Sequence, residues 1–110
     1  MPHELCLVYV TTKDSSEAKT ISKHLLEKKL IACGNILPNM SSQYFWEGKS
    51  EESSECVLLL KTSSLNFTQI ESEIEKIHSY DTPCILSIPI NNCGTKYKDW
   101  LLTQLGEQND

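Results

Sequence analysis

A hairpin decides the fold of this chain: Ser42–Lys49 reads SQYFWEGK and Glu55–Thr62 reads ECVLLLKT. The glycine of the first stretch supplies the backbone angles that a tight connection between two strands requires. Aromatic and aliphatic residues fill both arms, as strands prefer. The pattern extends over Ala32–Trp46 and Lys49–Thr62, longer than the usual strand of about five or six residues. We therefore expect part of the hairpin to project beyond the domain, with its aromatic tip available for assembly with other copies.

The length of 110 residues suits a single domain, which buries roughly 65% of the surface that its unfolded chain exposes. We expect one domain over residues 1–110, with an ordered core over about 4–105 and a frayed tail at Glu107–Asp110. A core of this size folds without a disulfide, and no metal or other cofactor is required for folding.

All ten basic residues are lysines, and the formal net charge is −5. The chain therefore lacks the planar guanidinium group that best binds phosphates and guanine edges. Nucleic acid is not an expected partner. We interpret the acidic excess as a solubilising surface, with attraction of cations as the alternative.

Five cysteines indicate a reducing environment. They are Cys6, Cys33, Cys56, Cys84 and Cys93. They form no CxxC pair, so the spacing of a zinc knuckle is absent. Most lie in or beside apolar runs, where a free thiol packs as a small hydrophobe. Met1–Glu4 lacks the basic segment of a signal peptide, and the apolar run that follows is too short to span a membrane. We expect a cytoplasmic protein with no membrane contact.

The remaining elements follow from apolar periodicity and capping signals. Leu5–Val10 is a short β-rich run, and Asp14–Glu17 has the spacing of a capping box at the start of an amphipathic helix. Ser63–Asn66 offers polar caps for a second helix. The expected order is strand, helix, two hairpin strands, helix, strand and a last helix, over about 5–10, 14–28, 31–46, 49–62, 63–77, 84–90 and 97–105.

This β-α-β-β-α-β order predicts an α+β, ferredoxin-like sandwich with a long projecting hairpin and an additional C-terminal helix. In that topology the second and fourth strands lie at the edges of the sheet. These two strands contain Pro38 and Pro89, which fit at edges or bulges and not in central strands. Two apolar edges would be exposed in a lone monomer, so we expect self-association.

Four motifs together resemble the CutA divalent-cation tolerance family. They are KKLIACGNILP at 28–38, SQYFWEGK at 42–49, ECVLLLKT at 55–62 and HSYDTP at 78–83. The resemblance spans about residues 7–101. It implies a ferredoxin-like fold, a compact homotrimer whose edge strands pair between subunits, and a link to divalent metal tolerance with copper or similar ions as ligands. It supplies no catalytic reaction.

His78 is the leading candidate for a metal ligand, because it ends a helix just before a turn and a neutral imidazole can bind copper or zinc. A capping or hydrogen-bonded structural histidine is the alternative. Some members of the resembled family carry a thiol at the end of the first strand and a carboxylate after the Thr-Pro step; Val10 and Cys84 stand there in this chain. Cys84 with His78 would form an N/S pair suited to Cu(I) or Zn(II), and Cys84 as a core residue is the alternative.

Two further groups of residues complete the candidate site. Tyr80 and Asp81 are expected to line the same cleft, with Lys61 and Glu55 reaching it across a subunit boundary. An ion pair of Lys61 with Glu55 or Asp81 is the alternative. Large residues with polar tips suit oligomer interfaces, and on that ground the expected trimer interface contains Tyr44, Trp46 and Trp100.

The first functional hypothesis is a CutA-like homotrimer that binds copper or other divalent cations weakly at inter-subunit clefts and serves metal homeostasis without turnover. A trimeric signalling or scaffold protein that resembles the PII regulators and binds a small metabolite is the second. The absence of arginine and of a phosphate-binding glycine loop argues against it. An enzyme with an active site between subunits is the third, although the sequence contains no recognised catalytic motif.

Overall fold

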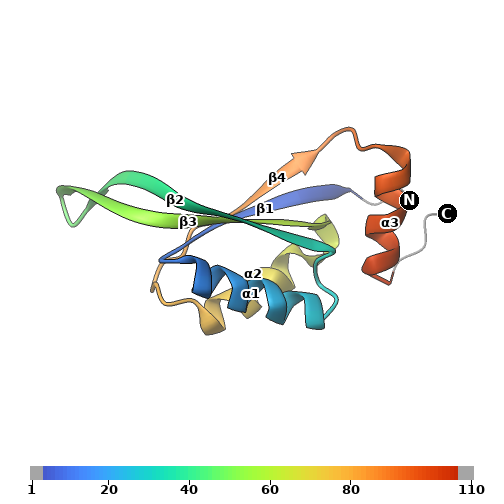
Figure 1. Ribbon diagram of the computed structural model, residues 1–110, viewed down its shortest axis with the longest axis horizontal. Helices are drawn as coiled ribbons and strands as arrows, with labels where there is room; N and C mark the ends of the chain where they lie inside the picture. Colours follow the sequence, from blue (N-terminus) through green and yellow to red (C-terminus); the bar gives the residue numbers. More distant parts are fainter. Residues whose placement is uncertain (1–3, 107–110) are drawn as a thin grey trace.

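The computed structural model describes residues 4–106, which form a four-stranded antiparallel sheet with two helices on one face (Figure 1). The strands are β1 Leu5–Thr12, β2 Cys33–Trp46, β3 Lys49–Ser63 and β4 Ile85–Ile90. The helices are α1 Ser15–Glu27, α2 Phe67–Ile77 and α3 Thr95–Gln104, with a 3-10 turn η1 at Ser64–Asn66. The predicted α+β arrangement is confirmed. The predicted tail at Glu107–Asp110 lies outside the described residues.

The strand order is β2-β3-β1-β4, so the two strands that contain Pro38 and Pro89 are at the edges, as predicted. A proline in a central strand would remove a ladder hydrogen bond, whereas an edge position tolerates its missing N–H group. The edge positions predicted from the ferredoxin-like topology are thus confirmed, and the two prolines are consistent with them.

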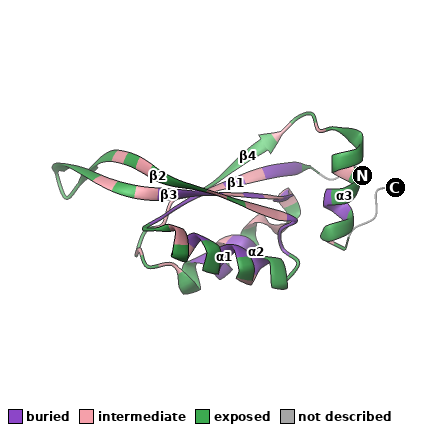
Figure 2. Cartoon of the chain, viewed as in Figure 1, coloured by how far each residue is buried: buried purple, intermediate pink, exposed green. Residues whose placement is uncertain are grey.

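The main core lies between the sheet and helices α1 and α2 (Figure 2). Alternate residues of the central strands face the helices, including Val8 and Val10 of β1 and Leu58 and Leu60 of β3, all fully buried. The helices contribute apolar residues at helical spacing, which are Ile21 and Leu25 of α1 and Ile70 and Ile74 of α2. Each such side chain contributes about 1.5–3 kcal/mol through burial, so this layer fixes the position of both helices.

Helix α1 begins with the predicted N-cap, Asp14. The hydrogen bond that the Glu17 side chain accepts in return differs from that of a capping box. The backbone N–H of Glu17 donates to Oδ1 of Asp14 at 2.8 Å. Oε1 of Glu17 accepts from the backbone N–H of Lys13 at 3.1 Å, one residue before the N-cap, and not from the N–H of Asp14 as in a standard capping box. The other Glu17 oxygen is thereby left for a contact with the turn after α2.

The hairpin of β2 and β3 extends well beyond the helices (Figure 1). Its strands contain 14 and 15 residues, and the molecule measures 50 Å along its longest axis against 26 and 22 Å along the others. Trp46 pairs with Lys49 at the tip. Glu47 and Gly48 between them have φ values of 51° and 79°, the positive angles that a two-residue type I′ turn requires.

A β-bulge interrupts β2 beside Pro38. Leu37 pairs with Val57, and Met40 pairs with Glu55, so β2 contains one more residue than β3 between these pairs. Asn39 adopts a φ of 64° within the bulge, a conformation that asparagine tolerates better than most residues. Because side chains alternate along a strand, the extra residue changes which residues of β2 point away from the helices.

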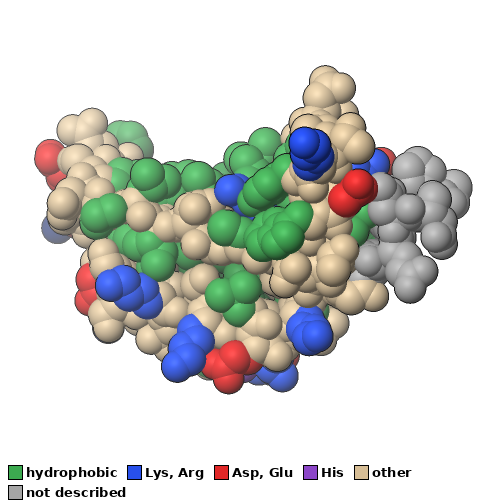
Figure 3. Space-filling view, turned by 45° about the vertical axis from the view of Figure 1, so that its right-hand side comes forward, with side chains coloured by type: hydrophobic (Ala, Val, Ile, Leu, Met, Phe, Trp, Pro, Cys, Tyr) green, Lys and Arg blue, Asp and Glu red, His purple; other side chains and the backbone are tan. Residues whose placement is uncertain are grey.

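The sheet face opposite α1 and α2 carries exposed apolar side chains. Leu86 and Ile88 of β4 are 53% and 44% exposed, and Leu37 of β2 is 50% exposed. Helix α3 covers only one end of the sheet, where Leu101 and Leu102 form a second small cluster with Leu5 and Ala32. Figure 3 shows hydrophobic side chains in a band along the sheet. We call the part of the sheet not covered by a helix the open face.

Candidate functional site

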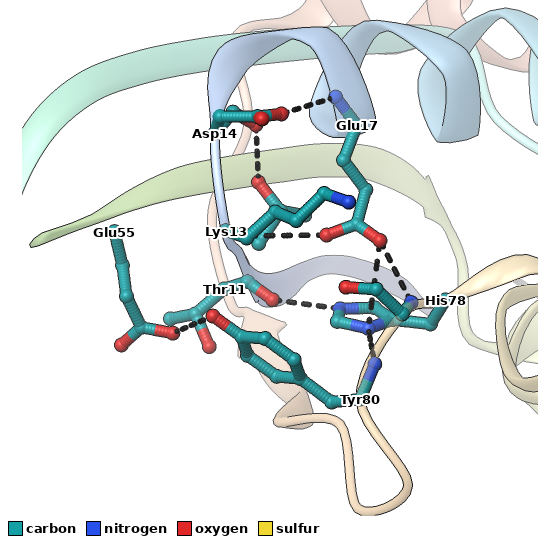
Figure 4. A network of polar contacts seen from close by, with 9 residues as sticks. Thr11, Lys13, Asp14, Glu17, Glu55, His78 and Tyr80 are labelled. Carbon is teal, nitrogen blue, oxygen red and sulfur yellow. Dashed lines mark hydrogen bonds and ion pairs between the residues drawn. The ribbon is translucent and has the colours of Figure 1, made fainter. Parts of the chain in front are cut away.

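His78 ends α2 and holds the turn that follows it (Figure 4). Nε2 of His78 lies 2.8 Å from the carbonyl oxygen of Thr11. Since a carbonyl only accepts, this nitrogen is the protonated one. Nδ1 accepts from the backbone N–H of Tyr80 at 3.0 Å, as the second nitrogen of a neutral imidazole can. The side chain is fully buried, so the ring joins the end of β1 to the turn.

Both ring nitrogens of His78 are therefore engaged within the chain. A metal would have to displace the Tyr80 N–H or the Thr11 carbonyl to bind this ring. Among residues 4–106, no three His, Cys, Asp or Glu side chains gather closely enough to hold a metal ion. The geometry fits the structural alternative for His78, and its role as a metal ligand stays a prediction.

Glu17 of α1 is hydrogen-bonded to the same turn. Its Oε2 accepts from the backbone N–H of Ser79 at 2.7 Å and lies 3.9 Å from Nδ1 of His78. Burial opposes ionisation of this carboxyl, but the N–H donors of Lys13 and Ser79 stabilise the carboxylate more strongly. The pKa of Glu17 is consequently lowered from its ordinary value. An ionised Glu17 thus belongs to the folded state at neutral pH.

Tyr80 extends from the turn toward the hairpin and donates from its hydroxyl to Oε2 of Glu55 at 2.9 Å. Burial of the phenol and the neighbouring Glu55 carboxylate both oppose its ionisation, and they raise the pKa of Tyr80 far above the ordinary value of a tyrosine. The rings of His78 and Tyr80 also pack at a centroid distance of 4.8 Å. The phenol of Tyr80 is therefore protonated at neutral pH, and its hydrogen bond to Glu55 links the turn to β3.

A pocket of about 580 Å³ lies beside this network, where the hairpin leaves the domain. Its walls come from the end of β1, the hairpin strands and the turn that precedes β4. We name it the hairpin pocket and define it by its principal side chains, which are Tyr44, Trp46, Glu51, Glu55, Tyr80, Asp81 and Cys84. The aromatic and acidic residues predicted for a cleft are thus brought together in one chain.

Cys84 forms part of the pocket wall and is half-buried. Burial, together with the negative charge of Glu55, raises the pKa of its thiol, and a hydrogen bond with Thr11 opposes this only in part. The thiol is therefore protonated at neutral pH. Because metals bind the thiolate, a metal at Cys84 would have to release this proton.

Lys61 and Trp100 lie elsewhere in the chain. Lys61 pairs with Cys33 and Leu7 in the sheet, and its ammonium lies 5.3 Å from the ring centroid of Tyr97 in α3, within range of a cation–π contact. The alternative of an ion pair between Lys61 and Glu55 or Asp81 is wrong within one chain. Trp100 packs against Tyr97 at 5.4 Å, and its place in a subunit interface stays a prediction.

Sequence reasoning missed three parts of this arrangement. Glu17 was recognised only as a capping residue, and nothing in the sequence places its second oxygen beside residue 79. Thr11 contributes a backbone carbonyl, which leaves no signature in residue type. Glu51 has no role in the sequence analysis beyond its share of the acidic excess. The alternation of β3 places Glu51 and Glu55 on one face, and this signal assigns Glu51 to the pocket.

Comparison with known proteins identifies the family of this chain. A family model described as CutA1 divalent ion tolerance protein matches residues 6–104. The chain belongs to the CutA1 family. The divalent-cation tolerance protein CutA of Archaeoglobus fulgidus is 44% identical over 94 residues, which cover 86% of this chain and 91% of that protein. The resemblance of the four sequence motifs is thereby confirmed.

Other CutA proteins extend the comparison. A solved structure described as the periplasmic divalent cation tolerance protein CutA from Archaeoglobus fulgidus has a TM-score of 0.89 and 40% identity, covering 92% of this chain and 98% of that chain. The chloroplastic protein CutA of Arabidopsis thaliana is 35% identical over 95 residues, covering 86% of this chain and 52% of that protein. The fold is thus the CutA1 fold. Within residues 4–106, no helix is long and apolar enough to cross a membrane.

Proposed function

We propose that this CutA1-family chain contributes to divalent-cation tolerance as a homotrimer that binds copper or other divalent cations weakly at clefts between its subunits. The names of its relatives support the tolerance role. The observation that carries the assembly is the open face, where apolar side chains lie exposed beside two edge strands. The relatives are named for tolerance and not for a reaction, and the proposal assigns no catalytic step.

Self-association would bury the open face. Leu86 and Ile88 are about half exposed at alternate positions of β4, on one face of the sheet, and monomeric proteins rarely leave contiguous apolar surface in water. The edge strands β2 and β4 also offer backbone groups for pairing with another chain. In this assembly Tyr44, Trp46 and Trp100, each about half exposed, would contact the neighbouring subunits.

The proposed cation site combines donors from more than one copy. Cys84, Asp81 and Glu55 line the hairpin pocket, yet the described residues of one chain form no group of three metal ligands. A second subunit that supplies the missing donors would complete the site. In this proposal His78 acts as a positioning residue, because it holds the turn that carries Asp81 and Cys84.

Light scattering coupled to size-exclusion chromatography tests the assembly. Wild-type protein is expected at three times the mass of the chain, and Ile88→Lys is expected to dissociate because it puts a charge on the buried open face. Leu65→Lys is the matched control, since Leu65 is 69% exposed on η1, away from the open face. A monomeric wild type at micromolar concentration would remove the trimer and the inter-subunit clefts together.

Calorimetric titration with copper tests the cation site. Cys84→Ser and Asp81→Asn are each expected to weaken binding, and wild-type binding should release protons because the thiol must ionise. Cys33→Ser is the control, because Cys33 lies on β2 and bonds with Asn35, outside the pocket wall. Equal affinity of all four proteins would exclude Cys84 and Asp81 as ligands.

The compartment is a separate proposal. Five free cysteines, of which Cys6 and Cys56 are buried, fit a reducing compartment such as the cytoplasm. Relatives carry the words periplasmic and chloroplastic in their names, so family membership alone does not select it.

A further inference from the structure

Helices α1 and α2 lie side by side on one face of the sheet, and each has an outer flank that faces away from the other helix (Figure 1). On their facing sides, Nε2 of His24 lies 2.8 Å from Oε1 of Glu73. On the other side of α1, Ser22 lies directly against Gly34 of the edge strand β2. Helix α1 therefore stands over the β2 edge, and α2 stands on the β4 side of the sheet.

The outer flank of α1 is basic. Lys19 lies three residues before Ser22, and residues at this spacing are neighbours on a helix surface. Lys23 follows Lys19 by one turn, and both are exposed. Among residues 4–106 neither lysine has an ion-pair partner. Glu27 is the one acidic residue that continues this row toward the end of α1. We call Lys19 and Lys23 the basic flank.

The outer flank of α2 is acidic. Glu71 and Glu75 are each two positions from Glu73, a rotation of about 200° on a helix, so they lie opposite the side that faces α1. Within the described part of the chain neither has an ion-pair partner. The adjacent cation, Lys76, is engaged by Glu73 at 3.1 Å. We call Glu71 and Glu75 the acidic flank.

These charges distinguish the ways in which the edge strands of two copies can pair. Pairing of β2 with β2 would bring two basic flanks together, and pairing of β4 with β4 would bring two acidic flanks together. Like charges across an interface disfavour both contacts. Pairing of β2 with the β4 strand of the next copy brings opposite charges together. This contact is head-to-tail, and it repeats until a ring closes.

The two helices run in opposite directions. Glu17 at the start of α1 bonds with Ser79 just after α2, and Asn66 just before α2 bonds with the carbonyl of Leu30 after α1. In a ring whose axis runs along the strands, each copy keeps these directions, so α1 is also antiparallel to the α2 helix of the next copy. Four strands in each copy, about 4.8 Å apart, place these two helices roughly 10 Å from each other.

We propose that the basic flank of α1 binds the acidic flank of α2 in the neighbouring copy, with Lys19 toward Glu75 and Lys23 toward Glu71. Both pairs are separated by one helical turn, so antiparallel helices match them in this order. The contact selects the head-to-tail pairing of β2 with β4. It rests on the self-association in the proposed function, and it adds the surface and the direction by which copies recognise one another. It uses neither the open face nor the hairpin.

Carbodiimide cross-linking of the wild-type assembly tests the contact, because this reagent joins a lysine to a carboxylate only when the two touch. Mass spectrometry of peptides should find links between the basic flank and the acidic flank. These flanks lie on opposite sides of the helix pair in one chain, so such a link joins two copies. Rings mixed from ¹⁵N-labelled and unlabelled chains verify this origin. The link between Lys76 and Glu73, which are 3.1 Å apart within one chain, is the internal control.

A charge exchange tests the energetic role of one pair. Lys19→Glu should speed the exchange of subunits between labelled and unlabelled rings about fivefold, the equivalent of roughly 1 kcal/mol for an exposed pair. Addition of Glu75→Lys should restore the wild-type rate, because it recreates the pair with its charges reversed. Lys13→Glu is the matched control. It changes the net charge equally, but Lys13 precedes α1 at the end of the central strand β1, and the wild-type rate is expected.

Two outcomes would overturn the proposal and leave the trimer in place. One is a trimer that forms the Lys76–Glu73 link but no link between the flanks. The other is a Lys19→Glu effect that Glu75→Lys does not reverse. A monomeric wild type would overturn this contact together with the assembly on which it rests. No measurement here uses copper, so failure of the cation site is recognised separately.

Discussion

The backbone N–H of Tyr80 donates a hydrogen bond to Nδ1 of His78 at 3.0 Å, while the two rings pack at 4.8 Å. One residue therefore orients the other through both its backbone and its side chain. Nε2 of His78 is also hydrogen-bonded to the Thr11 carbonyl. The imidazole therefore connects β1 to the turn that forms part of the pocket wall.

Replacement of His78 by alanine should destabilise the chain by about 2 kcal/mol or more, because it leaves the Thr11 carbonyl and the Tyr80 N–H without partners in a buried position. Urea unfolding monitored by circular dichroism measures the change. His24→Ala is the matched control: His24 is 35% exposed and pairs with Glu73 at 2.8 Å, so its loss should cost at most about 1 kcal/mol. Equal losses of stability in the two variants would contradict the role of the His78 ring in connecting β1 to the turn.

Glu17→Gln should lower stability at neutral pH and reduce its dependence on acid. The pKa of Glu17 is lowered in the folded chain, so its carboxylate stabilises the fold above the ordinary value of 4.5, and this contribution is lost as the pH falls through the folded pKa. The difference in unfolding free energy between wild type and variant should therefore shrink below pH 4.5. A constant difference from neutral to acid pH would show that the loss is steric and not electrostatic.

Tyr80→Phe should cost about 1 kcal/mol at neutral pH, through loss of the hydrogen bond to Glu55. The pKa of Tyr80 is raised above its ordinary value of 10.0, so the neutral phenol stabilises the fold below pH 10 and this contribution is lost as the pH rises further. Wild type should then lose more stability than the variant above pH 10. The tyrosinate absorbance assigned to Tyr80 should appear late, together with unfolding; its appearance at pH 10 in folded protein would contradict the buried bond.

Gly34→Ala should destabilise the chain by about 1–3 kcal/mol through overpacking. A β-carbon at Gly34 would lie 2.1 Å from Oγ and 3.1 Å from Cβ of Ser22 on α1, so the helix or the strand must shift. Thermal unfolding measures the loss, and Gly34→Ala combined with Ser22→Gly should recover much of it. Gly94→Ala is the control, because nothing lies within 4 Å of its β-carbon position. Equal losses for both alanines would mean that contact with Ser22 does not decide the effect.

The architecture was predictable because each element carries a local signal. The positive φ angles of the Glu47-Gly48 turn require a residue such as glycine, and the prolines of β2 and β4 exclude these strands from the centre of the sheet. The apolar period of α2 then selects its buried face. The predicted stretch from Ala32 to Trp46 is shorter by one residue in β2.

The candidate site was predictable only in part. Tyr80, Asp81 and Cys84 are close in sequence, and their meeting with Glu55 follows from the topology. The engagement of His78 was not predictable, because it depends on the Thr11 carbonyl and the Tyr80 N–H, and backbone groups have no residue-type signal. The alternative of an ion pair between Lys61 and Glu55 or Asp81 is wrong within one chain. It rested on opposite charges alone, which do not show how far apart two side chains lie.

The bulge beside Pro38 divides β2 into two halves whose side chains face different surroundings. Up to Leu37 the alternation of β2 is set by the helices, which take Ile36 into the core; from Met40 onward the phase is inverted, and even-numbered side chains face the pocket. Removal of Asn39 alone would restore a single phase and exchange the two sides of the tip, turning Phe45 inward and Tyr44 with Trp46 outward. One inserted residue thus allows the half of the strand that lines the pocket to change in sequence without disturbing the half that packs against the helices.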